Sequence, residues 1–151
     1  MALYREGSTA PVVDDGPAAL PLAEWVKNPF ATALALSNTD RVEDLASHIG
    51  RLKLIVLHFP KFSDGRAYSQ ARLLRGRLGY QGELRATGGV LQDQAPFMLR
   101  CGFDSFESDQ KGFGEALARA RTLFSVVYQP AEDDRSPVSQ LRLKRRNVAA
   151  A

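Results

Sequence analysis

Apolar residues recur along this chain at two spacings that follow one another, which predicts strands followed by helices. The first unit is a short apolar strand at 31–36, followed by a helix in which Val42, Leu45 and Ile49 lie three or four positions apart. The segment 38–40 between them reads Asn-Thr-Asp, and these side chains cap helix N-termini. One strand and one helix are therefore expected here.

The second unit has the most strand-like segment of the chain. Residues 52–59 are almost continuously apolar, as is typical of a strand buried on both faces of a parallel sheet. The helix predicted over 67–78 has Ala71, Leu74 and Leu78 on its inner face, and Gly79 is placed to end it. Its arginines are expected to face outward: Arg72, Arg75 and Arg77.

Two further units follow. A strand at 83–87 leads through a Gly-Gly turn into a helix at 90–100, which Pro96 should kink or split. The last unit is a strand at 103–107 and a helix at 113–128. Four strand-helix units in series predict a mainly parallel sheet with right-handed crossovers, and therefore an α/β fold.

Two architectures can hold four such units. One is half of a (β/α)8 barrel, a half-TIM-barrel that would cover its open side by pairing with a second copy as a homodimer. The alternative is an open doubly wound sheet. Central strands of an open sheet are uniformly apolar, whereas segments 83–87 and 103–107 alternate and place charge on one face. This alternation favours the half-barrel.

The ends of the chain differ from its middle. Residues 1–20 mix glycine, proline and aspartate with few apolar residues and predict an irregular arm with a short edge hairpin. Residues 21–130 are expected to form one α/β domain. Residues 131–151 begin with a polar break and include Lys144, Arg145 and Arg146, which predicts a basic flexible tail.

Composition narrows the class of protein. The chain has 151 residues, 44% of them hydrophobic, which is enough for one core. Cys101 is its one cysteine and is expected to be a buried, inert thiol, so neither a disulfide nor a metal site is predicted. No segment has the roughly 18 consecutive apolar residues of a membrane span, and no export signal is seen at the N-terminus. A cytoplasmic protein is therefore expected.

Charge is unevenly distributed. The formal net charge is +3, yet residues 51–100 carry 9 basic and 3 acidic side chains. This segment could attract a small anionic ligand or an acidic partner protein, although arginines along a helix also occur as a solvated face. The basic C-terminal tail has no interleaved aromatic residues, so nucleic acid is not expected as a partner.

The densest group of polar side chains follows the second predicted strand. Lys61, Gly65 and Ser69 could bind sulfate, phosphate or a carboxylate beside the start of the next helix. The residues expected to act on such an anion are Asp64, Arg66, Tyr68 and Arg85. The alternative is structural, with Asp64 capping the helix and pairing with Arg66. The chain has neither a Walker loop, Gly-x-x-x-x-Gly-Lys-Ser/Thr, nor the Gly-x-Gly-x-x-Gly turn that binds dinucleotides. Nucleotide binding is therefore not supported.

A second group depends on register. The ends of neighbouring parallel strands should bring together His58, Arg85 and Glu107, with Thr87 beside them. Such a group could perform acid-base chemistry on an anion, but a one-residue change in register would turn any member to the opposite face. Asp93 and Gln94 open the third predicted helix and are secondary candidates for ligand binding.

Four blocks of the sequence resemble a known family. They are Phe59-Pro60-Lys61-Phe62-Ser63-Asp64-Gly65-Arg66-Ala67-Tyr68-Ser69, then 71–75, 82–88 and 100–107. Together they are similar to the bacterial family catalogued as domain of unknown function 934, over about residues 20–128. Besides the residues at 64–66, 68–69 and 85, the family's pattern is matched at Asp93, Gln94, Arg100 and Cys101. The chain departs from the pattern at Ala67, where glycine is usual, and at Gly89, where aspartate is expected.

The resemblance implies a biological context. Members are described as oxidoreductases linked to sulfite reduction, with genes near assimilatory sulfite reductase. It therefore implies a role in sulfate and sulfite assimilation, with sulfite reductase as a partner. No motif in the chain encodes a flavin, nicotinamide, haem or iron–sulfur site, so the cofactor is left unknown. An anion-binding enzyme and an accessory subunit of the reductase both remain open.

Overall fold

The computed structural model describes residues 1–149, and in them six strands form one sheet in the order β1-β6-β5-β4-β3-β2. The strands from β2 to β6 are parallel and lie in chain order, while β1 pairs antiparallel with β6. The strands are β1 (Ala2–Arg5), β2 (Leu20–Pro21), β3 (Ala33–Leu36), β4 (Leu54–Phe59), β5 (Glu83–Gly88) and β6 (Ser105–Ser108). The predicted mainly parallel α/β fold is confirmed.

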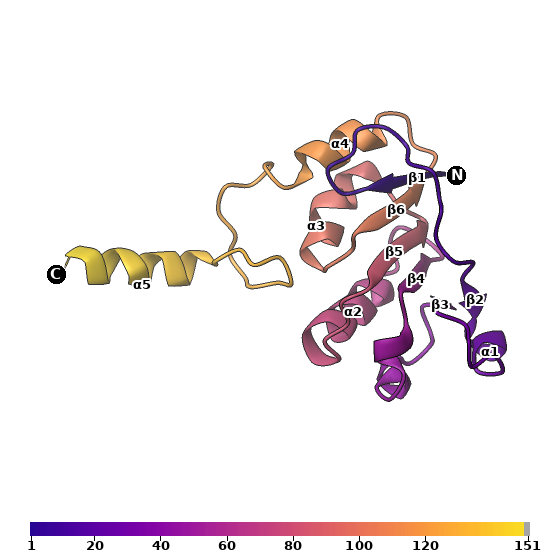
Figure 1. The fold of residues 1–151 in the computed structure, drawn as a ribbon. Coiled ribbons are helices and arrows are strands. Elements are labelled where there is room, and N and C mark those ends of the chain that lie inside the picture. The colour runs from indigo at the N-terminus through magenta and orange to yellow at the C-terminus, as the bar shows by residue number, and fades with distance from the viewer. Residues whose placement is uncertain (150–151) are drawn as a thin grey trace.

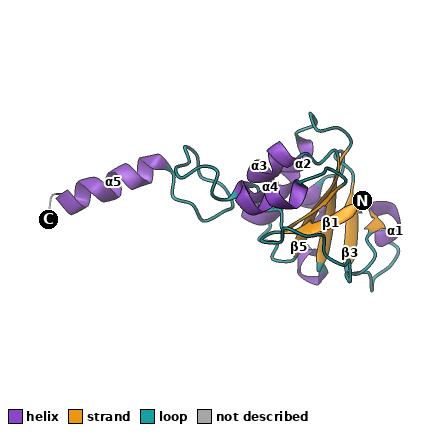
Figure 2. Cartoon of the chain, turned by 90° about the horizontal axis from the view of Figure 1, so that it is seen from above, coloured by secondary structure: helices purple, strands orange, loops and turns teal. Residues whose placement is uncertain are grey.

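The strand order places the main helices on one face of the sheet. Right-handed crossovers that always step in the same direction leave the connecting helices on the same side. Figures 1 and 2 show α2 (Arg66–Arg72), α3 (Ala95–Arg100) and α4 (Phe113–Ala120) together on that side. A doubly wound sheet needs a reversal of strand order, and β2 to β6 contain none.

The two faces of the sheet are packed differently. On the helix-covered face, Leu34, Ile55, Leu57 and Phe106 belong to a core that also includes residues of α2, α3 and α4. On the opposite face, which we call the open face, the second core cluster is small and consists of Ala33, Leu54 and Val56, with partly buried Ala19 and Ala35 packed against it. The open face is therefore where polar residues of the strands can remain accessible.

Three of the predicted helices are interrupted. The helix expected at 42–49 is two short 3-10 turns, η1 (Val42–Leu45) and η2 (Ile49–Arg51). The one expected at 90–100 is split into a 3-10 turn, η4 (Gln92–Gln94), and α3, as Pro96 predicts. The last one, expected to reach residue 128, ends at Ala120, and beyond it Leu123, Phe124 and Val126 are exposed whereas Val127 is buried.

The helix expected at 67–78 differs from the prediction in its second half, where Arg75 turns inward. After α2 the chain continues as a π-helical segment, η3 (Leu73–Arg77), and the wider turn rotates the residues that follow. Arg75 was predicted to face solvent, but it turns inward and donates to the carbonyl groups of Tyr80, Gly82 and Gly102. It also binds the Asp104 carboxylate at 2.5 Å. Arg75 therefore ties η3 to the loops that lead into β5 and β6.

The two ends of the chain are more ordered than their composition predicts. The first strand, β1, extends the main sheet, and Leu3 also bridges to Val12 in an antiparallel sense, as the expected edge hairpin requires. The first helix, α1 (Leu22–Trp25), is short, and strands and helices follow one another from there to α4. Within the predicted flexible tail, residues Val138–Ala149 form α5, which extends away from the sheet (Figure 1). Leucine, arginine and lysine favour helix, and α5 contains no glycine or proline. The tail's last two residues lie outside the described residues.

None of the helices in residues 1–149 combines the length and apolar character needed to cross a membrane.

Candidate functional site

Asp64, in the loop between β4 and α2, and Arg66, the first residue of α2, bind each other. Arg66 Nε and Nη2 donate to the Asp64 carboxylate at 3.0 and 2.7 Å, and the Arg66 backbone N–H donates to it at 3.1 Å. Asn38 Nδ2, from the loop after β3, donates to the same carboxylate at 2.5 Å. These bonds, led by that of the Arg66 side chain, hold the pKa of Asp64 far below its usual range. Arg66 is therefore already neutralised by a neighbour.

The residues predicted to bind an anion surround this pair. Lys61, Gly65 and Ser69 are all exposed, and the Lys61 side chain has no ion-pair partner in residues 1–149. Gln94 Nε2 donates to the Phe62 carbonyl at 2.9 Å, so η4 fastens the loop from the neighbouring crossover. The arrangement can attract a small anion only through the charge of Lys61, since Arg66 is engaged by Asp64.

Gly89, where the resemblance leads us to expect aspartate, lies tightly against the loop after β4. Its N–H donates to the Phe59 carbonyl at 2.7 Å, and a Cβ added there would lie 2.6 Å from the Phe62 nitrogen. An aspartate at 89 would therefore require the loop at 61–62 to move. Asp93 lines an apolar groove described below.

The structure does not bring together the four residues predicted as catalytic. Tyr68 lies on α2 with its ring packed against Phe59 and Phe97 at centroid distances of 5.1 and 5.5 Å. Burial raises the pKa of Tyr68 to about 12, so its hydroxyl stays protonated near neutral pH. Arg85 lies on the open face of the sheet, because it alternates with buried Leu84 and Ala86 of the helix-covered face. Asp64, Arg66 and Tyr68 are thus separated from Arg85 by the sheet.

The second predicted group does meet. His58 pairs with Thr87 across β4 and β5, and His58 Nδ1 lies 3.3 Å from Thr87 Oγ1. Arg85 Nη1 lies 3.6 Å from Glu107 Oε1 on β6. All four line one groove of about 530 Å³ on the open face, and residues 16–19 of the N-terminal arm form part of its wall. The register on which this prediction depended is therefore the register of the structure.

Arg85 is the centre of that groove. Its side chain is 4% exposed and is held by two carboxylates: Asp14 at 2.6 and 3.0 Å, and Glu83 at 2.9 and 3.2 Å. Burial by itself would lower the pKa of Arg85, but these two partners raise it, so the guanidinium stays charged. The pKa of Asp14 is lowered in return, and the hydrogen bonds from the Arg85 side chain are the main cause.

Sequence reasoning missed both carboxylates. Glu83 could have been found, because it precedes Arg85 by two positions and so shares its face of the strand. Asp14 lies 71 residues from Arg85 in an irregular arm, and no local pattern signals the contact.

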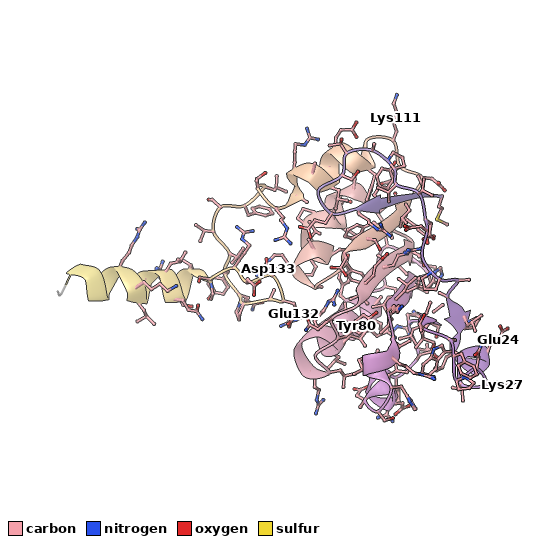
Figure 3. All side chains as sticks on the ribbon, viewed as in Figure 1. Glu24, Lys27, Tyr80, Lys111, Glu132 and Asp133 are labelled. Carbon is pink, nitrogen blue, oxygen red and sulfur yellow. The ribbon has the colours of Figure 1, made fainter. Side chains whose placement is uncertain are left out.

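A second groove, of about 360 Å³, lies between α3 and residues 123–128. Five large apolar side chains around it are more than half exposed: Phe97, Leu123, Phe124, Val126 and Tyr128. We call these five residues the apolar surface. Arg100 fixes the segment that follows. Its Nε donates to the Asp133 carboxylate at 3.0 Å, and its backbone carbonyl accepts from the Glu132 N–H at 2.9 Å. Figure 3 shows Glu132 and Asp133 between the sheet domain and α5.

Cys101 is buried, and burial raises the pKa of its thiol to about 11. The thiol is therefore protonated and poorly nucleophilic at neutral pH. In residues 1–149, no three histidine, cysteine, aspartate or glutamate side chains converge in a way that could hold a metal ion.

A family model described as "Bacterial protein of unknown function (DUF934)" matches residues 33–139, from β3 to the start of α5. No curated protein and no solved structure matches the chain.

Proposed function

Because this chain belongs to the bacterial family of unknown function DUF934, we propose that it is a cytoplasmic accessory protein of assimilatory sulfite reduction, which binds sulfite reductase through the apolar surface. The observation that carries this proposal is the exposure of Phe97, Phe124 and Tyr128 around one groove. Exposed aromatic side chains gathered in one place are characteristic of protein interfaces.

The state of the loop after β4 supports an accessory role over catalysis there. Asp64 and Arg66 satisfy each other, and Tyr68 is held protonated against Phe59. A nucleophile or general base in this group would need a free partner or a pKa near neutrality. The pathway itself comes from the resemblance described above, and the oxidoreductase label of the family would then describe the reaction that the partner performs.

A binding experiment tests the surface. The tagged full chain is incubated with purified sulfite reductase, and retention is compared between wild type and the double variant Phe124→Ser/Tyr128→Ser. The variant should lose retention while keeping its circular dichroism spectrum, since both side chains are exposed. Phe30→Ser is the matched control, because Phe30 is 90% exposed but lies next to α1, at the other end of the sheet. Equal retention by all three proteins would contradict the proposal.

A growth experiment tests the pathway. A deletion strain should fail on sulfate and on sulfite but grow on sulfide, and the wild-type gene should restore growth. Arg66→Ala should also restore growth if the apolar surface carries the function. Loss of complementation by a folded Arg66→Ala protein would instead indicate that the loop after β4 carries it. Normal growth of the deletion strain on all three sulfur sources would remove the pathway assignment.

The open-face groove supports a second candidate function, an anion-binding enzyme built on a half-barrel that pairs with a second copy. His58, Arg85 and Glu107 offer an acid, a base and a cation along one groove, and the one-sided helices match what a half-barrel needs. Light scattering should give the mass of a dimer for this candidate. His58→Ala should then abolish complementation without changing retention on the reductase, whereas the accessory role predicts normal complementation.

A further inference from the structure

The N-terminal arm holds a carboxylate in the place where the open-face groove could bind one from solution. Asp14 Oδ2 and Oδ1 accept from Arg85 Nη1 and Nη2 at 2.6 and 3.0 Å. This two-bond geometry is the one by which arginine recognises free carboxylates and related anions. Arg85 is almost completely buried, whereas the Asp14 side chain is 48% exposed. The cation is thus built into the sheet, while its partner lies on the surface.

The arm that carries Asp14 is weakly attached. Among the side chains of residues 1–145 and the backbone of residues 1–149, the polar contacts from residues 13–19 to the rest of the protein are those of Asp14 with Arg85 and of Asp15 with Arg5, the latter at 3.3 Å. The hydrogen bond of the Gly16 N–H to Asp14 is internal to the arm. Displacing Asp14 from Arg85 would therefore break few other interactions.

The two other carboxylates that pair with Arg85, those of Glu83 and Glu107, differ in how many partners bind them. Glu83 accepts from Ser105 Oγ at 2.6 Å and from Arg85, and it also pairs with Arg5. Glu107 lines the groove with a single ion pair in the described residues, the 3.6 Å contact with Arg85. A ligand that brings only a negative charge would leave Glu107 without a new partner. A ligand with an ammonium group beside its carboxylate would satisfy both ends.

We infer that the open-face groove binds a small α-amino acid or a similar zwitterion, whose carboxylate replaces that of Asp14 on Arg85 and whose ammonium group binds Glu107. The remainder of the ligand would contact Ala35, Val56 and the exposed ring of His58, which line the same groove. Asp14 is then an internal competitor, and the arm at 13–19 opens when ligand binds. Ligand binding to this groove is a property of the purified chain alone, so it does not depend on whether the chain binds sulfite reductase.

Calorimetry of the full chain with the twenty proteinogenic L-amino acids tests this inference. At least one should bind the wild type, and Asp14→Asn should tighten its binding about tenfold, the factor expected if the arm is open in about a tenth of the molecules. The matched carboxylate without the amino group should bind at least about tenfold more weakly. Glu107→Gln should abolish the difference between the two ligands. Arg85 itself is left unchanged, because its replacement endangers folding.

Two results would overturn the inference. The first is that no amino acid binds Asp14→Asn at millimolar concentration, which would make Asp14 and Arg85 a structural pair only. The second is that amino acid and matched carboxylate bind equally, which would make the groove a simple anion site with no role for Glu107. Glu24→Gln is the matched control, because Glu24 is an exposed carboxylate on α1, outside both the groove and the arm, and its replacement should leave every affinity unchanged.

Discussion

Two arginine–carboxylate pairs of this protein have similar hydrogen-bond lengths but differ in the sequence separation of the partners and in the burial of the arginine. Arg66 and Asp64 are two residues apart, at the start of α2, and the Arg66 side chain is 59% exposed. Arg85 and Asp14 are 71 residues apart, and the Arg85 side chain is buried beneath the N-terminal arm. An exposed pair gives little stability, whereas removing one member of a buried pair leaves an uncompensated charge. Contact distance alone therefore does not say which pair the fold depends on.

Arg85→Ala should have the largest effect in this comparison. It leaves Glu83, Glu107 and Asp14 facing one another without their common cation, so the free energy of unfolding should fall by about 3–5 kcal/mol. Urea denaturation followed by circular dichroism measures the change. A loss no larger than that of Arg66→Ala would mean that the groove relaxes or hydrates around the carboxylates.

Asp14→Ala should have a smaller effect, about 1 kcal/mol. Arg85 keeps Glu83 and Glu107 after this substitution, and Asp14 is half exposed, so its loss is partly compensated by water. Amide hydrogen exchange should at the same time speed up across residues 13–19. Unchanged exchange in the arm would show that contacts other than that of Asp14 hold it in place.

The Asp14 contact should also be lost in acid. Because Arg85 lowers the pKa of Asp14 in the folded protein, the contact stabilises the fold fully above the ordinary value of 3.8 and ceases to do so as pH falls through the lower folded value. The stability difference between wild type and Asp14→Asn should therefore be constant near neutral pH and shrink below about pH 4. A difference as large at pH 2 as at pH 7 would contradict this assignment.

Arg66→Ala should have the smallest effect, with no shift in the urea midpoint. The guanidinium is exposed, and Asn38 still binds the Asp64 carboxylate in the variant. Asp64→Asn serves as the companion variant. A fall in stability as large as that of Asp14→Ala would show that this loop is a structural support of the sheet edge.

The sequence by itself determined the parts of this protein that depend on local pattern. Apolar runs and alternation located β3, β4, β5 and β6 within a few residues, and their serial order predicted a parallel sheet. They also predicted that His58 and Thr87 would meet, because neighbouring parallel strands of similar length align their ends. Side chains two apart on a strand share a face whatever the rest of the chain does, so these features needed no tertiary information.

Only the tertiary structure decided how the candidate residues were divided between the two faces of the sheet. Asp64, Arg66 and Tyr68 are close in sequence to each other, yet Arg85 lies on the other face with Asp14, which came from an arm with no recognisable pattern. The π-helical turn that buries Arg75 and the end of α4 at Ala120 also depend on packing. The physical reason is that such contacts are set by the path of loops and by burial across many residues, whereas periodicity records only which neighbours along the chain share a face.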